Sequence, residues 1–78
     1  MEEKVKEFLK EEFPDTDFSG TSLVEDEVLD SLTLTEIIQA LSMEYDIEIP
    51  YEEIVEDNFN SLDAIAALVA RLVNEKEG

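Results

Sequence analysis

Residues 30–50 of the chain read DSLTLTEIIQALSMEYDIEIP, and this stretch decides the fold. Apolar residues recur in it at the three- and four-residue spacing of a helix. They form one stripe along that helix: Leu34, Ile37, Ile38, Leu41 and Tyr45. The pattern predicts a helix from about residue 31 to residue 45. Thr33 and Glu36 also match a capping box, which would move the start by two residues.

The sequence before this helix predicts one more helix and a long loop. The apolar residues near the N-terminus share one helix face: Val5, Phe8 and Leu9. Because Pro14 disfavours helical geometry at the residue before it, we expect this helix to span residues 2–13. Residues 15–29 are rich in Asp, Ser and Thr and include Gly20, which is typical of a loop.

The sequence after residue 50 predicts a short helix and a final long one. Pro50 suits the start of a short helix over residues 51–55. Asn60 or Ser61 suits the N-cap of an alanine-rich last helix. The apolar face of that helix consists of Leu62, Ile65, Val69, Leu72 and Val73. Together the segments predict an all-α fold, a small four-helix bundle with a short third helix, in one domain over residues 1–78.

The composition is strongly acidic, with 22 Asp and Glu against 5 Lys and Arg and a net charge of −17. Residues 11–70 contain no basic side chain. This charge excludes a nucleic-acid binder, since such proteins neutralise phosphates with basic side chains, and argues against docking on an anionic membrane. The acidic surface either only keeps the chain in solution or offers a docking face to basic partners.

Residue types that most enzymes need are missing from the chain. It has no Cys and no His, which excludes a thiolate nucleophile and a Ser–His–Asp triad and removes the commonest metal ligands. We therefore expect a protein that is not an enzyme and holds no metal. No apolar run approaches the ~20 residues of a spanning helix, and no targeting signal opens the chain. We expect a cytoplasmic monomer without membrane insertion.

One residue of residues 30–50 is a candidate for chemistry. Ser31 is predicted at the start of a helix, where free N–H groups and the helix dipole favour a phosphate ester. Asp30 and Ser31 are also ordinary N-cap residues, and for this short motif alone the cap interpretation is favoured.

Several further stretches combine with this motif. In addition to Asp30-Ser31-Leu32 itself, they are Glu36, five residues after the serine, and residues 44–50, with weaker similarity in residues 23–26 and 60–65. Together they resemble the acyl carrier protein family. In that family the serine of an Asp-Ser-Leu motif receives 4′-phosphopantetheine from coenzyme A. The resemblance implies that Ser31 is the attachment point and that Asp30 and Leu32 border the cofactor.

The resemblance implies a carrier rather than an enzyme. The thiol of the arm would carry an acyl or aminoacyl group as a thioester, so the chain needs no Cys or His of its own. A phosphopantetheinyl transferase would attach the arm with Mg²⁺, and Asp30 would contact that metal. Acyl-loading and acyl-transfer enzymes with basic docking surfaces are the other partners implied. The docking residues expected are Glu36, Val28, Leu29, Gln39 and Met43.

Two features depart from the carriers of fatty-acid biosynthesis. Val28 and Leu29 stand where those carriers have a glycine and a small residue. Ser42 and Met43 stand where they usually have glutamates. Val28 and Leu29 are closer to D-alanyl and some aminoacyl or polyketide carriers, and the loss of charge at Ser42 and Met43 argues against a fatty-acid role, so the pathway stays open.

Two alternatives have no prosthetic arm. Residues 15–20, DTDFSG, partly match the opening of a calcium-binding loop. Asp26 occupies the twelfth position of that loop, where a glutamate is expected, and Ser22 occupies the eighth, where an apolar residue is usual. The second alternative is an acidic adaptor that binds basic proteins.

Overall fold

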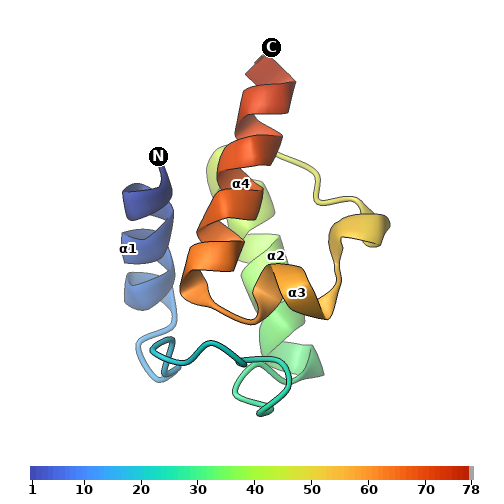
Figure 1. Ribbon diagram of the computed structural model, residues 1–78. Coiled ribbons are helices and arrows are strands. Elements are labelled where there is room, and N and C mark those ends of the chain that lie inside the picture. The colour runs from blue at the N-terminus through green and yellow to red at the C-terminus, as the bar shows by residue number, and fades with distance from the viewer. Residues whose placement is uncertain (78) are drawn as a thin grey trace.

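Four α-helices and one 3-10 turn make up the structure, a computed structural model that describes residues 1–77. The elements are α1 (Glu2–Glu12), α2 (Ser31–Tyr45), η1 (Tyr51–Glu53), α3 (Glu56–Phe59) and α4 (Leu62–Glu77). No residue from 1 to 77 lies in a strand. The predicted all-α fold with four helices is confirmed (Figure 1).

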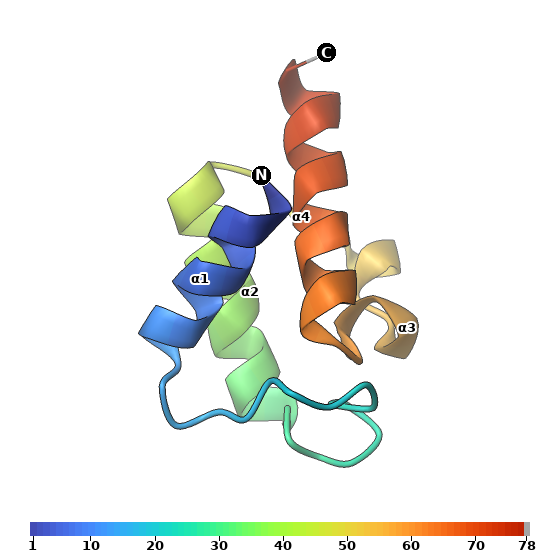
Figure 2. The same cartoon turned by 60° about the vertical axis from the view of Figure 1, so that its left-hand side comes forward.

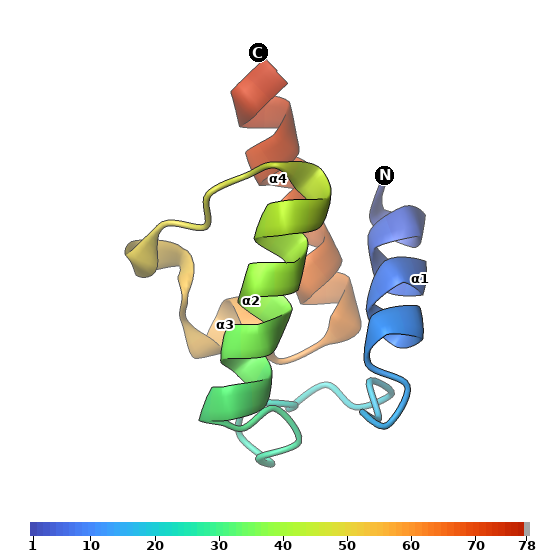
Figure 3. The same cartoon turned by 180° about the vertical axis from the view of Figure 1, so that it is seen from behind.

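Helices α2 and α4 both begin at the same end of the molecule. Helix α1 runs towards this end, and α2 and α4 both run away from it (Figures 1 and 3). The long loop between α1 and α2 passes across the same end, beneath the helices (Figure 2). The connection after α2 returns through η1 to α3, which lies beside the first turn of α4. Segments far apart in sequence therefore meet where α2 begins.

Helices α1 and α2 end where local signals place their ends. Asp30 is the N-cap of α2, and Asp46 after its last turn adopts the left-handed conformation at φ 51° and ψ 51°. That conformation lets the next N–H, of Ile47, also donate to the Ser42 carbonyl, at 3.1 Å, and terminates the helix. Helix α1 ends at Glu12, one residue before the predicted end, with Phe13 as its C-cap ahead of Pro14.

The prediction of one short helix over residues 51–55 is wrong in detail. Tyr51–Glu53 forms only a 3-10 turn, and Pro50 is its N-cap. The β-branched Val55 is extended, at φ −128° and ψ 156°, and separates this turn from α3. Asn58 in α3 donates to the Glu53 carbonyl at 2.8 Å, so the two short elements support each other.

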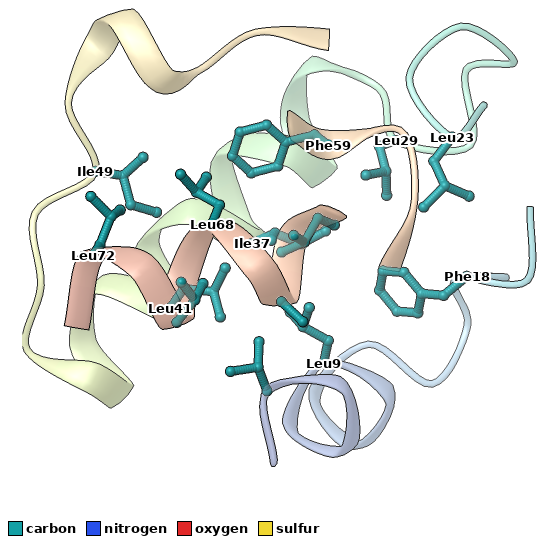
Figure 4. Packing of buried hydrophobic residues seen from close by; sticks show 14 of the residues in the cluster. Leu9, Phe18, Leu23, Leu29, Ile37, Leu41, Ile49, Phe59, Leu68 and Leu72 are labelled. Carbon is teal, nitrogen blue, oxygen red and sulfur yellow. The ribbon is translucent and has the colours of Figure 1, made fainter. Parts of the chain in front are cut away.

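A single apolar cluster lies between the helices and also receives residues of the long loop (Figure 4). The predicted stripes of α1, α2 and α4 all contribute to it. Its members with fully or almost fully buried side chains include Val5, Leu9, Leu23, Ile37, Leu41, Phe59, Ile65 and Val69. Phe59, in the four-residue α3, is the largest of these buried side chains. The sequence pattern did not identify it as a core residue.

Basic side chains of α4 hold the acidic connection between α2 and α3. Arg71 donates to both carboxylate oxygens of Glu53, at 2.8 and 3.2 Å, and these bonds lower the pKa of the Glu53 carboxyl. Lys76 pairs with the Asp46 carboxylate at 2.8 Å. Two points of the connection are therefore tied to α4.

None of the helices in residues 1–77 has the length and apolar character that a membrane-spanning segment needs.

Candidate functional site

Ser31 is the first residue of α2, and its side chain is exposed. The N-cap position belongs to Asp30, whose Oδ1 accepts from the Thr33 N–H at 2.8 Å. The capping box predicted from Thr33 and Glu36 is therefore not used, because the Thr33 N–H is already bonded to Asp30. Within the described residues the Ser31 hydroxyl makes no hydrogen bond to the protein. Asp30 does the capping, and the serine hydroxyl next to it remains free to react.

The start of α2 differs in charge from the starts of the other helical elements. α1, η1, α3 and α4 each have at least one carboxylate in the first turn, whereas α2 has none. Asp30 stands just outside α2, and the hydrogen bond from the Thr33 N–H lowers the pKa of its carboxyl. A phosphate ester on Ser31 would thus meet free N–H groups and the positive end of the dipole without a carboxylate inside the turn. This environment fits the phosphodiester of a prosthetic arm.

An exposed surface follows Ser31 along α2. Leu32, Glu36, Gln39 and Met43 recur at three- and four-residue spacing and share one helix face. All four are exposed, and the apolar Leu32 and Met43 are 69% and 84% exposed. We call these four residues the α2 face. Val28, in the loop before Ser31, is also exposed.

Leu29 does not belong to this surface. Its side chain is only 2% exposed and lies in the core near Phe59 and Leu23 (Figure 4). The prediction that Leu29 docks partners is wrong for its side chain, because the loop turns inward one residue before the Asp30 cap. Leu29 instead anchors the chain immediately ahead of Asp30 and Ser31.

Asn60 and Ser61 have separate roles, although the sequence offered both as caps of α4. The Ser61 Oγ accepts from the Ala64 N–H at 3.0 Å and caps the helix. Asn60 is directed to the long loop, where its Oδ1 accepts from the Val24 N–H at 3.1 Å. Sequence reasoning missed this contact, because residues 36 positions apart show no local pattern.

The calcium-loop alternative finds no ligand set in residues 1–77. No group of three or more His, Cys, Asp or Glu in this part of the chain could hold a metal ion. The Asp17 carboxylate accepts from the Ser19 Oγ at 2.6 Å and the Ser19 N–H at 3.0 Å, and these bonds lower its pKa. Phe18, between them, points into the core (Figure 4). The aspartate and serine oxygens are thus engaged in a local turn.

A cavity of about 530 Å³ lies elsewhere, between α1, the long loop and the start of α4. Lys6, Lys10 and Asp63 are among its lining residues, and no residue of α2 is. Ser31 thus lies on open surface rather than in this cavity. That placement suits a residue that another enzyme must reach and modify.

The sequence matches the family described as phosphopantetheine attachment site over residues 2–69. No curated protein and no solved structure matches the chain. Domains of the matched family bind 4′-phosphopantetheine covalently and are carriers, not catalysts. In general they interact with phosphopantetheinyl transferases and acyl-handling enzymes. Since the match covers most of a chain with an exposed serine at the start of α2, this protein belongs to the phosphopantetheine attachment site family.

Proposed function

We propose that the protein is an acyl carrier protein with its prosthetic arm on Ser31. When attached, the arm supplies the thiol that carries an acyl or aminoacyl group as a thioester. The observation that carries the proposal is the free, exposed Ser31 hydroxyl at the first residue of α2, inside the segment that matches the family. The absence of a carboxylate from the first turn of α2 supports a phosphodiester at this position.

The attachment chemistry makes few demands on the chain. The Ser31 Oγ would form a bond to the phosphorus of coenzyme A next to the pantetheine. The bond from that phosphorus to the bridging oxygen would break, adenosine 3′,5′-bisphosphate would leave, and the serine proton would pass to a base of the transferase. Asp30 is exposed and its carboxyl has a lowered pKa, so it stays ionised and can contact the Mg²⁺ that the transferase brings. The proposed location is the cytoplasm, where coenzyme A is available.

Incubation with coenzyme A, Mg²⁺ and a phosphopantetheinyl transferase tests the proposal. The intact mass should rise by one phosphopantetheine, and peptide mapping should place the addition on Ser31. Transferases of different specificity should be tried in parallel, with a carrier that each is known to modify as the positive control. An unchanged mass with all of them, while those controls are modified, would reject the carrier proposal and favour the acidic adaptor.

The α2 face is the proposed docking surface for partner enzymes. It lies directly after Ser31, so an enzyme that reaches the arm also reaches Leu32 and Glu36. Glu36 offers a carboxylate to a basic partner, which would raise the association rate at low salt. Gln39 and Met43 are neutral, so the far half of the α2 face carries less charge than a basic partner would prefer. We propose that enzymes of fatty-acid elongation use this carrier poorly.

Added charge on the α2 face should improve turnover by a fatty-acid elongation enzyme. Both side chains of a Gln39→Glu, Met43→Glu variant project from exposed positions. Ser42 is not used, because it is half-buried and its hydroxyl donates to the Ile38 carbonyl. With the same acyl group loaded, the KM of the variant should fall about two- to tenfold, from charge pairs of ordinary surface strength. The improvement should shrink as salt is raised.

A neutral double variant, Gln39→Ala with Met43→Gln, is the matched control. It changes the same positions without adding charge and should behave as the wild type does. Equal KM values for the charged variant and this control would show that charge on the α2 face does not select partners. Val28, exposed on the other side of Ser31, would then be the next position to vary.

A further inference from the structure

Asn60 accepts hydrogen bonds from three successive backbone N–H groups of the long loop. The Leu23 N–H donates to the Asn60 carbonyl at 2.8 Å, the Val24 N–H to its Oδ1 at 3.1 Å and the Glu25 N–H to the same Oδ1 at 3.4 Å. Asn60 follows α3 directly, some 35 residues away along the chain. Two acceptor atoms of one residue thus fix the direction of three loop residues.

No other residue performs this task for the loop. Among the described residues, every hydrogen bond that joins residues 17–29 to a segment outside the loop and its immediate flanks ends on Asn60. The remaining bonds are short-range, such as the one from the Asp26 N–H to the Ser22 carbonyl at 2.8 Å. Loss of the Asn60 side chain would therefore remove two of the three bonds and leave only the one to its backbone carbonyl.

A further hydrogen bond links the loop residues held by Asn60 to the segment just before Ser31. The Leu29 N–H donates to the Leu23 carbonyl at 3.0 Å, so the residue held by Asn60 in turn holds the residue before Asp30. Leu23 and Leu29 are both buried in the same apolar cluster as Phe59, the residue that precedes Asn60 (Figure 4). Apolar packing keeps the loop against the core, and the hydrogen bonds to Asn60 set its register.

We propose that Asn60 is a positioning residue, which presents Ser31 to the phosphopantetheinyl transferase by holding the loop that leads into α2. The inference rests on the proposed attachment at Ser31. A transferase that binds the start of α2 also meets residues 22–29, which lead directly into it. If that loop is ordered in only a fraction of molecules, the apparent affinity for the carrier falls by that fraction. Asn60 therefore acts on KM, whereas the chemistry at the Ser31 Oγ is unchanged.

The test compares Asn60→Ala with two other variants of the same junction. Asn60→Asp retains an acceptor at the same place, and Ser61→Ala removes the cap of α4 but leaves the loop contacts alone. For Asn60→Ala the KM for the carrier should rise about five- to tenfold, because two side-chain hydrogen bonds are lost, with little change in kcat. Asn60→Asp should restore most of the affinity. Ser61→Ala should lower the melting temperature without raising KM.

Amide hydrogen exchange supplies a readout that needs no transferase. Asn60→Ala should speed the exchange of the Val24, Glu25 and Leu29 amides about tenfold relative to the wild type, whereas Ser61→Ala should leave these amides unchanged. Unchanged exchange of these amides in Asn60→Ala would overturn the claim that the Asn60 side chain holds the loop. Faster exchange together with an unchanged KM, or an equal rise of KM in Ser61→Ala, would overturn the positioning role. If the wild type accepts no arm while its exchange pattern is as expected, the proposed function fails, and with it the role towards the transferase.

Discussion

The Ser31→Ala variant is expected to accept no phosphopantetheine arm and to fold as the wild type does. The Ser31 hydroxyl is exposed and makes no hydrogen bond to residues 1–77, so its removal costs no structural contact. Asp30 still caps α2 through the Thr33 N–H, and alanine is a good helix former at the first helical position. The melting temperature should thus stay within a few degrees of the wild type, as for most exposed substitutions.

The structure also explains why no other serine should replace Ser31. The Ser61 Oγ caps α4, the Ser42 Oγ donates to the Ile38 carbonyl and the Ser19 Oγ donates to Asp17. Each of these three hydroxyls is already engaged, and the remaining serine, Ser22, lies within the long loop. None of the four stands at the first residue of a long helix. The measurement is the intact mass after incubation with coenzyme A and a transferase that modifies the wild type.

Ser61→Ala is the matched serine control and should gain one arm, as the wild type does. An arm on Ser31→Ala would move the attachment point to another residue. A folded Ser31→Ala protein without an arm, beside a modified Ser61→Ala protein, would establish Ser31 as the attachment point. The melting temperature of both variants must be measured in parallel, so that loss of the fold is not mistaken for loss of the site.

The long helices could be predicted from the sequence because local chemistry specifies them. α2 was expected over residues 31–45 and spans Ser31–Tyr45, since its apolar stripe, its N-cap and its final turn all agree. The exposed serine of the site was predictable for the same reason, because the Asp30-Ser31-Leu32 motif lies on that helix start.

Short elements and loop burial were harder, because they depend on contacts between distant residues. One short helix was expected over residues 51–55, but the 3-10 turn and α3 are held by the partner contacts of Glu53 with Arg71 and Asn58. A leucine such as Leu29 occurs in apolar docking surfaces as well as in hydrophobic cores, so its residue type alone does not decide between them. Only the arrangement of the loop over the core decides that it is buried.

Asn60 shows the same limit at the candidate site. Asparagine is as good an N-cap as serine, so the sequence could not assign the cap of α4 between Asn60 and Ser61. The structure separates them because the long loop crosses the end of the molecule where α4 begins. A contact between residues 24 and 60 has no periodicity that a single sequence reveals.

Phe59→Ala is expected to destabilise the protein more than the other substitutions discussed above. The Phe59 side chain is 0% exposed and lies in the core beside Leu29 and Leu68 (Figure 4). Removal of a buried phenylalanine ring costs about 3–5 kcal/mol, from lost burial and from the cavity left behind. A domain of this size has a total stability of only about 4–12 kcal/mol at the usual value per residue. The variant should lose a large part of its stability, and its melting temperature should fall by more than about 12 °C.

Thermal and urea unfolding followed by circular dichroism measure this effect, with two controls from the same region. Phe59→Leu keeps most of the apolar volume and should lose clearly less stability than Phe59→Ala. Tyr51→Ala removes an aromatic ring that is 88% exposed, and should change the free energy of unfolding by less than about 0.5 kcal/mol. A change below about 1 kcal/mol for Phe59→Ala would mean that the core closes around the lost ring. The four-residue α3 would then contribute little to the hold on Leu29, and the anchor ahead of Ser31 would rest mainly on the hydrogen bonds to Asn60.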